Sequence, residues 1–228
     1  MDDILQQQLD YYRVRAAEYD EWFYRRGRYD YGEAINGQWF EQAAQVREAL
    51  GALGPVDSAL ELASGTGIWT QELTRIAGRV TALDGSPEMI AINRAKVNNP
   101  RVTYREVDLF GWQPEEQFDL VFFGFWLSHV PPERLDGFLR AVYAAVRPGG
   151  RLFLVDSMAE KTSSAHDHRP PDADDLYHDR MLNDGRAFRV VKVFYAPPAL
   201  QARLNALGFE AAIQSTAYFL YGQALRPG

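Results

Sequence analysis

Short apolar runs alternate with helical patterns between residues 58 and 156 of the chain. Phe118–Phe123 is apolar throughout, which is typical of a strand covered on both faces. The alternation predicts an α/β fold: a Rossmann-like, mostly parallel seven-stranded sheet flanked by helices. The expected strands are Ser58–Leu62, Val80–Leu83, Val102–Glu106, Phe118–Phe123, Arg151–Val155, Glu210–Gln214 and Ala217–Leu220, and the expected helices between the first five are Trp69–Ile76, Pro87–Asn98 and Pro132–Val146, the last closed by an RPGG turn.

The segments outside this core carry weaker patterns. From Leu5 to about Phe23 apolar and aromatic residues recur at helical spacing, which predicts one helix with Tyr12 and Tyr19 on the same face. A second helix is expected over Gln38–Leu50. Ser157–Gly185 is polar and predicts a long loop, followed by a strand near Phe188–Phe194 and a helix from Pro197 to Leu207.

Composition excludes several kinds of function. The 228 residues contain no cysteine, so disulfides, thiolate zinc sites and cysteine nucleophiles are absent. A net charge of −7 argues against nucleic acid as the main partner, and the arginines at 25, 26 and 28 are interpreted as a solvated surface cluster. The polar start MDDILQQQLD is unlike a signal peptide, and the apolar run 120–127 is too short to span a bilayer. We therefore expect a cytoplasmic protein without a membrane span.

The strand Ser58–Leu62 runs into the glycine turn of the segment ELASGTG, residues 61–67. Glycines between a strand and a helix allow close approach of the backbone to a ligand, and the first N–H groups of the helix can bind a polar group. A dinucleotide-binding turn requires a third glycine, but Ile68, Trp69 and Thr70 stand there. The missing third glycine therefore argues against a nicotinamide-dependent oxidoreductase, which stays an alternative.

Acidic residues follow the first three strands at the same edge of the sheet. Asp84 stands 17 residues after Gly67 and could accept hydrogen bonds from both hydroxyls of a ribose. Asp108 precedes Leu109 and Phe110, which could contact an adenine ring. With Glu61 at the end of the first strand, these residues predict a nucleoside-type ligand at the carboxyl ends of the strands.

The ordered segments ExAxGTG, TALDGSPEMI, EVDLF, FDLVFFGFWLSHV and VRPGG resemble the class I methyltransferases that use S-adenosylmethionine (SAM). The resemblance covers about Ser58 to Asp156 and implies that SAM is the cofactor and S-adenosylhomocysteine (SAH) the product. It implies that Asp84 holds the ribose, that Asp108 meets the adenine amino group, and that Ala63, where many members have glycine, begins the turn around the methionine moiety. The full expected cofactor site is Tyr19, Ala63, Ser64, Gly65, Gly67, Asp84, Gly85, Ser86, Met89, Asp108, Leu109, Phe110 and Phe125.

The resemblance also divides the chain. It implies an N-terminal helical lid over residues 1–40 and a SAM-binding domain over 41–228, with a substrate-shaping insertion at about 157–195. Within these segments Tyr12, Trp22 and Arg186 are the expected substrate contacts. A carboxylate-bearing acceptor would suit Arg186 and Arg189, and surface salt bridges explain these two arginines equally well.

His129, in WLSHV, is the candidate general base, because an imidazole can accept a proton near neutral pH. The histidines at 166, 168 and 178 lie in a segment rich in proline and aspartate, and we predict no metal there.

The sequence favours methylation of an oxygen or nitrogen of a small molecule. Carbon methylation, as in the quinone-pathway enzymes that share the cofactor motifs, remains open, as do a nicotinamide-dependent oxidoreductase and a catalytically silent SAM-binding protein. A monomer or a homodimer is expected, and the identity of the acceptor is not predicted.

Overall fold

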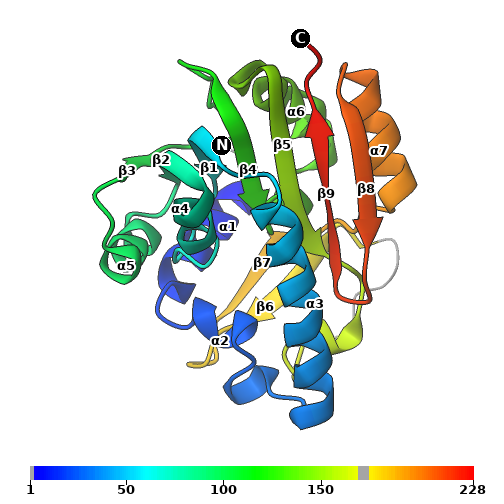
Figure 1. Ribbon diagram of the computed structural model, residues 1–228. Coiled ribbons are helices and arrows are strands. Elements are labelled where there is room, and N and C mark those ends of the chain that lie inside the picture. The colour runs from blue at the N-terminus through cyan, green and yellow to red at the C-terminus, as the bar shows by residue number, and fades with distance from the viewer. Residues whose placement is uncertain (1–2, 169–174) are drawn as a thin grey trace.

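The computed structural model describes residues 3–168 and 175–228 and contains a central seven-stranded sheet (Figure 1). The order of its strands is β3-β2-β1-β4-β5-β9-β8, and β9 runs in the opposite direction to the other six strands. This confirms the predicted Rossmann-like sheet. The strands are β1 (Val56–Leu62), β2 (Ala77–Asp84), β3 (Val102–Glu106), β4 (Phe118–Gly124), β5 (Val146–Ser157), β8 (Glu210–Ser215) and β9 (Phe219–Leu225).

Helices cover both faces of the sheet. On one face α3 (Glu33–Gly51) and α4 (Thr70–Ile76) pack over a cluster that contains Leu120 and Phe122. On the other face α6 (Pro132–Ala145) and α7 (Pro197–Ala206) pack over Val121 and Phe123. These four neighbours in β4 point alternately to the two faces and are all fully buried, which explains why the strand is apolar throughout. The remaining core helix, α5 (Pro87–Val97), lies beside β2 and β3.

The N-terminal segment differs from its prediction. The prediction of a single helix over residues 5–23 is wrong. The chain instead forms α1 (Asp3–Arg15), a turn and α2 (Tyr19–Phe23), followed by the short 3-10 helix η1 (Gly27–Tyr29). The two helices have different packing targets, since Tyr11 of α1 is buried with Leu182 and Val190 while Phe23 of α2 joins the core beneath α3. One straight helix cannot reach both.

The segment expected as a loop over 157–185 contains regular structure. The 3-10 helix η3 (Lys161–Ser163) and the strand β6 (Tyr177–Met181) lie within it, and β6 pairs antiparallel with β7 (Ala187–Val191). The loop prediction is therefore wrong over β6, whose polar residues belong to a two-stranded hairpin outside the main sheet. Residues 169–174 of the expected loop lie outside the described residues.

Several predicted boundaries are also shifted. The RPGG segment is not a turn after α6 but part of β5, where the register with β4 is irregular. The helix α3 begins at Glu33 rather than Gln38, so the expected lid boundary at residue 40 lies within an unbroken helix. In the described part of the chain, no helix combines the length and the apolar character needed to cross a membrane.

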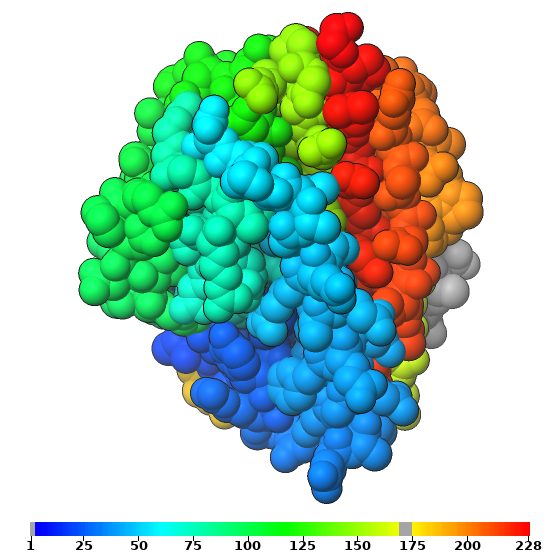
Figure 2. Space-filling view, viewed as in Figure 1, coloured from blue at the N-terminus to red at the C-terminus, as the bar shows by residue number. Residues whose placement is uncertain are grey.

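In the space-filling view the N-terminal segment and α3 form a continuous surface below the sheet (Figure 2). The contacts of α1 are mainly with β7, so the N-terminal segment and the β6–β7 hairpin meet beyond the carboxyl ends of the parallel strands. The candidate site lies at this meeting point.

Candidate active site

The turn after β1 holds its backbone in a conformation that side chains rarely adopt. Ala63, Gly65 and Gly67 have φ angles of 55°, 50° and 88°. A Cβ atom on Gly67 would lie 2.5 Å from Oδ1 of Asn93, so only glycine fits there. The positive φ of Ala63 explains why glycine is common at this place in the family that the sequence resembles.

A buried network supports the turn from behind. The hydroxyl of Thr70 donates to a carboxylate oxygen of Glu61 at 2.6 Å, and the side-chain amide of Asn93 donates to the Thr70 hydroxyl at 2.8 Å and to the Ser64 carbonyl at 3.2 Å. Burial raises the pKa of Glu61 to about 8. Glu61 therefore helps to fix the shape of the turn rather than line the cavity.

Asp84, at the end of β2, forms a hydrogen bond directly with the turn after β1. One carboxylate oxygen accepts from the backbone N–H of Gly65 at 2.7 Å, and the other accepts from the N–H of Ser86 at 2.9 Å. Burial raises the pKa of Asp84 to about 6 despite these hydrogen bonds, which lower it. Each carboxylate oxygen retains a further lone pair for a ligand hydroxyl.

A cavity beside Asp84 gathers most of the expected cofactor residues. Ser64 and Gly67 shape the turn without lining it, and Leu9, Val107, Gly124 and Trp126 are lining residues that the sequence reasoning missed. The complete lining is Leu9, Tyr12, Tyr19, Ala63, Gly65, Asp84, Gly85, Ser86, Met89, Val107, Asp108, Leu109, Phe110, Gly124, Phe125 and Trp126.

The side chains that line this cavity fit SAM. Asp84 offers acceptors for the ribose, while Met89, Leu109 and Phe110 offer apolar contacts for a ring. The hydroxyl of Ser64 is buried behind the turn and makes no hydrogen bond within the described residues.

A second cavity adjoins the first across a wall formed by Tyr12, Tyr19 and Phe125, which line both. Phe125 has a φ angle of 56° and packs against Trp22 with ring centroids 4.7 Å apart. The second cavity is lined by Tyr11, Tyr12, Arg15, Tyr19, Trp22, Tyr29, Phe125, His129, Ser157, Ser163, Ser164, His168, Arg180, Lys192 and Phe194.

Three cationic side chains face this second cavity, and none of the described residues that line it is acidic. Arg15 and Arg180 are partly buried, and neither has a carboxylate within ion-pair distance among the described residues. Burial and the neighbouring Arg15 lower the pKa of Arg180. Lys192 is buried and donates to Ser128 at 2.8 Å, with Asp156 at 3.5 Å, and burial lowers its pKa to about 8. The cavity is therefore electropositive.

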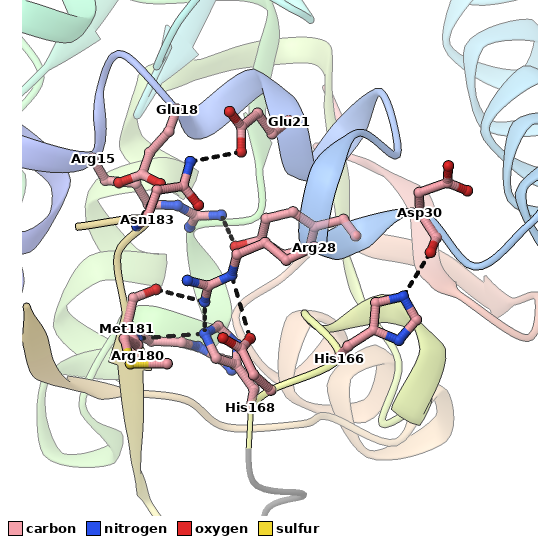
Figure 3. Close-up of polar contacts among 12 residues, drawn as sticks. Arg15, Glu18, Glu21, Arg28, Asp30, His166, His168, Arg180, Met181 and Asn183 are labelled. Atoms are coloured by element: carbon pink, nitrogen blue, oxygen red, sulfur yellow. Dashed lines mark hydrogen bonds and ion pairs between the residues drawn. The ribbon is translucent and has the colours of Figure 1, made fainter. Parts of the chain in front are cut away.

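Polar contacts connect the N-terminal segment with residues 167–168 and 181–183 near this cavity (Figure 3). Arg28 donates to the Met181 carbonyl at 2.6 Å, lies 2.6 Å from His168 and pairs with Asp167 at 3.3 Å. Asn183, just after β6, donates from its backbone N–H to Glu18 at 3.0 Å. These contacts close one side of the cavity.

Two of the three expected substrate residues line the second cavity, and the third lies outside it. Tyr12 and Trp22 line the second cavity, and the indole N–H of Trp22 donates to the Ser163 carbonyl at 2.8 Å. Arg186 lies outside it, exposed at the hairpin tip and paired with Asp184. The cations inside, at positions 15, 180 and 192, were not predicted. Arg15 could have been found from its helical spacing to Tyr11 and Tyr12, but no sequence signal marks the other two.

The candidate histidines have separate surroundings. His129 lines the second cavity, 2.8 Å from the Tyr12 hydroxyl. His166 stacks on Tyr31 and contacts the Asp30 carbonyl, as Figure 3 shows for the latter. Among the described residues no group of three histidine or acidic side chains could hold a metal ion.

Comparison with known proteins shows which family the chain resembles. The profile of a methyltransferase domain matches residues 59–150. Over 109 residues the chain is 37% identical to the uncharacterised methyltransferase sll0829 of Synechocystis sp., a match that covers 46% of this chain and spans only about half (49%) of that relative. Over 173 residues it is 27% identical to the ubiquinone/menaquinone biosynthesis C-methyltransferase UbiE of Enterobacter sp., covering 71% of this chain and 68% of UbiE.

Solved structures of DhpI match the whole chain. The DhpI–SAH complex and the DhpI–SAM–HEP complex are both 40% identical to the chain with a TM-score of 0.79, and the chain covers 98% and 99% of them. One contains SAH and the other contains SAM. The chain belongs to the class I SAM-dependent methyltransferases, and SAM is its cofactor.

Proposed function

We propose that the protein transfers the methyl group of SAM to a negatively charged oxygen of a small acid and so forms a methyl ester. The observation that carries this proposal is the set of cations in the second cavity, Arg15, Arg180 and Lys192. Lys192 has Asp156 at 3.5 Å, but Arg15 and Arg180 have no carboxylate within ion-pair distance among the described residues, and partly buried charges are costly without a counter-charge. An anionic acceptor supplies that counter-charge.

The same charges favour oxygen over nitrogen as the accepting atom. An ionised carboxyl or phosphonyl oxygen already carries the lone pair that attacks the methyl carbon, so no proton has to be removed. An amine at neutral pH is an ammonium ion, which the three cations repel and which needs a base before it can react. Attack by carbon needs a base as well.

The wall between the two cavities aligns the reactants. SAM supplies a methyl group on a positively charged sulfur. Tyr12, Tyr19 and Phe125 surround the junction, where aromatic faces stabilise positive charge and exclude water. An acceptor held by the arginines on one side and a cofactor held by Asp84 on the other meet there in line. The DhpI–SAM–HEP complex supports this arrangement, because DhpI holds a further component together with SAM.

A substrate panel tests the proposal. The protein is incubated with radiolabelled SAM and with small carboxylates, alkylphosphonates, phosphate monoesters, amines and neutral alcohols, and SAH and the methylated product are quantified. We expect methyl esters from at least one class of acid and no product from amines. Products from amines alone, with none from any acid, would refute it, and SAH binding without any product would favour a catalytically silent protein.

A matched pair of variants tests the cation set. Arg180→Met removes a charge that faces the cavity, whereas Arg186→Met removes one at the exposed tip of the same hairpin. Because hydrogen bonds to charged groups contribute about 1.5–3 kcal/mol, Arg180→Met should raise KM for the acceptor about 10- to 150-fold. Arg186→Met should leave KM unchanged. Equal effects of the two variants would contradict the assignment of the acceptor cavity.

A further inference from the structure

The contact between Tyr12 and His129 has a defined direction. Nδ1 of His129 lies 2.7 Å from the carbonyl oxygen of Val191, and a carbonyl can only accept, so Nδ1 carries a proton. Nε2 lies 2.8 Å from the Tyr12 hydroxyl. In a neutral imidazole with its proton on Nδ1, Nε2 is an acceptor, so Tyr12 donates its hydroxyl proton to His129.

The surroundings keep His129 neutral. The ring is buried, and Lys192, Arg180 and Arg15 all face it from neighbouring elements. Burial and these cations lower the pKa of His129 well below its ordinary value. Burial raises the pKa of Tyr12 well above its ordinary value, so its hydroxyl keeps its proton. The direction of the hydrogen bond is therefore the same throughout the neutral pH range.

The lid helix is docked so that this pair is held in place. Gln8, one helical turn before Tyr12 on α1, donates to the His129 carbonyl at 3.1 Å and accepts from the Val191 N–H at 3.0 Å. Gln8 is fully buried, so these bonds are shielded from water. Tyr12 thus lies at a fixed position in the wall that both cavities share.

We propose that Tyr12 is a positioning residue for the methyl group that is transferred, and that His129 acts through Tyr12 rather than as a general base. With its proton committed to His129, the Tyr12 oxygen presents its lone pairs to the junction of the two cavities. A methyl group on a positively charged sulfur has polarised C–H bonds, and an oxygen lone pair beside it accepts weak C–H···O hydrogen bonds that orient it.

This inference rests on the proposed function for its account of the proton. When the acceptor is an anion, the new O–CH3 bond forms as the S–CH3 bond breaks, and the electron pair of the broken bond stays on sulfur. The acid oxygen becomes a neutral ester oxygen and the sulfonium becomes a thioether. No proton is released, so a base at position 129 has nothing to accept.

A spectroscopic test needs no acceptor. SAM labelled with 13C in its methyl group is bound to the protein, and the methyl proton shift is measured by NMR. In Tyr12→Phe, which keeps the ring, we expect this resonance to move upfield because the C–H···O contacts are lost, while the affinity for SAM changes less than threefold. An identical methyl shift in the wild type and Tyr12→Phe would overturn the role of Tyr12, whatever the acceptor is.

The role of His129 is tested with the same probe and by kinetics. His129→Gln offers an amide oxygen to the Tyr12 hydroxyl and should retain the wild-type methyl shift, whereas His129→Leu should show the shift of Tyr12→Phe. With an acceptor from the substrate panel, Tyr12→Phe and His129→Leu should each lower kcat about three- to tenfold, and the double variant no further. A loss of 100-fold or more in His129→Leu and His129→Gln alike would restore the general-base role.

Discussion

The pKa of Asp84 makes cofactor affinity depend on pH in a predictable direction. We propose that its carboxyl group accepts hydrogen bonds from two ribose hydroxyls, for which it must be ionised. In the cofactor-free protein its pKa is about 6. Binding adds two donors to the charged form and returns the pKa towards its ordinary value of about 4. Affinity is therefore complete well above pH 6 and falls as the pH drops through 6.

The size of the effect follows from these two values. At pH 5 only about one tenth of Asp84 is ionised in the free protein, so the Kd for SAH should be about tenfold higher at pH 5 than at pH 7. Glu61 and Tyr19 titrate mainly above this interval, because burial raises the pKa of Glu61 to about 8 and raises the pKa of Tyr19 above its ordinary value. The α-amino group of SAH titrates above it as well.

Isothermal titration calorimetry with SAH between pH 5 and 7.5 measures this dependence. The matched control is Asp84→Asn, which cannot ionise and should bind weakly with a Kd that does not change over the interval. Since the folded-state pKa of Asp84 is raised, its ionisation destabilises the cofactor-free protein as the pH rises from about 4 through 6. A wild-type Kd that is constant from pH 5 to 7 would refute the ribose contact.

Three other substitutions test the frame of the site. Ala63→Gly removes the strain of a positive φ angle, but the greater freedom of glycine in the unfolded chain partly offsets this gain. We therefore expect denaturant titration to show a rise of at most about 1 kcal/mol in the free energy of unfolding, and calorimetry to show unchanged affinity for SAH. Gly67→Ala forces a Cβ atom onto Asn93 and should weaken SAH binding more than tenfold; wild-type affinity would show that the turn is not rigid. Arg28→Met removes contacts to Asp167, His168 and Met181 and should accelerate hydrogen exchange over residues 15–30, which unchanged protection would contradict.

Most of the cavity beside Asp84 was predictable from the sequence because its signals are local and ordered. Gly65, Asp84 and Leu109 stand at or just after the ends of strands of the parallel sheet, so their positions in the sequence determine their positions at one edge of the sheet. The polar segment 157–185 gave no such signal. Its strand β6 buries few side chains, so it lacks the alternation of apolar and polar residues from which strands are predicted.

The second cavity could not be predicted in the same way because tertiary contacts assemble it. Arg15 ends α1, Arg180 lies in the hairpin and Lys192 follows β7, and only the docking of α1 on β7 brings the three to one cavity. The sequence suggested a contact to a carboxylate at Arg186, but that residue lies exposed at the hairpin tip, paired with Asp184. Substitutions in α1 and the hairpin can therefore alter the charge of the second cavity while the sheet edge at Asp84 stays the same. In this chain, acceptor preference should follow the cations at positions 15, 180 and 192, whereas cofactor affinity should follow Asp84.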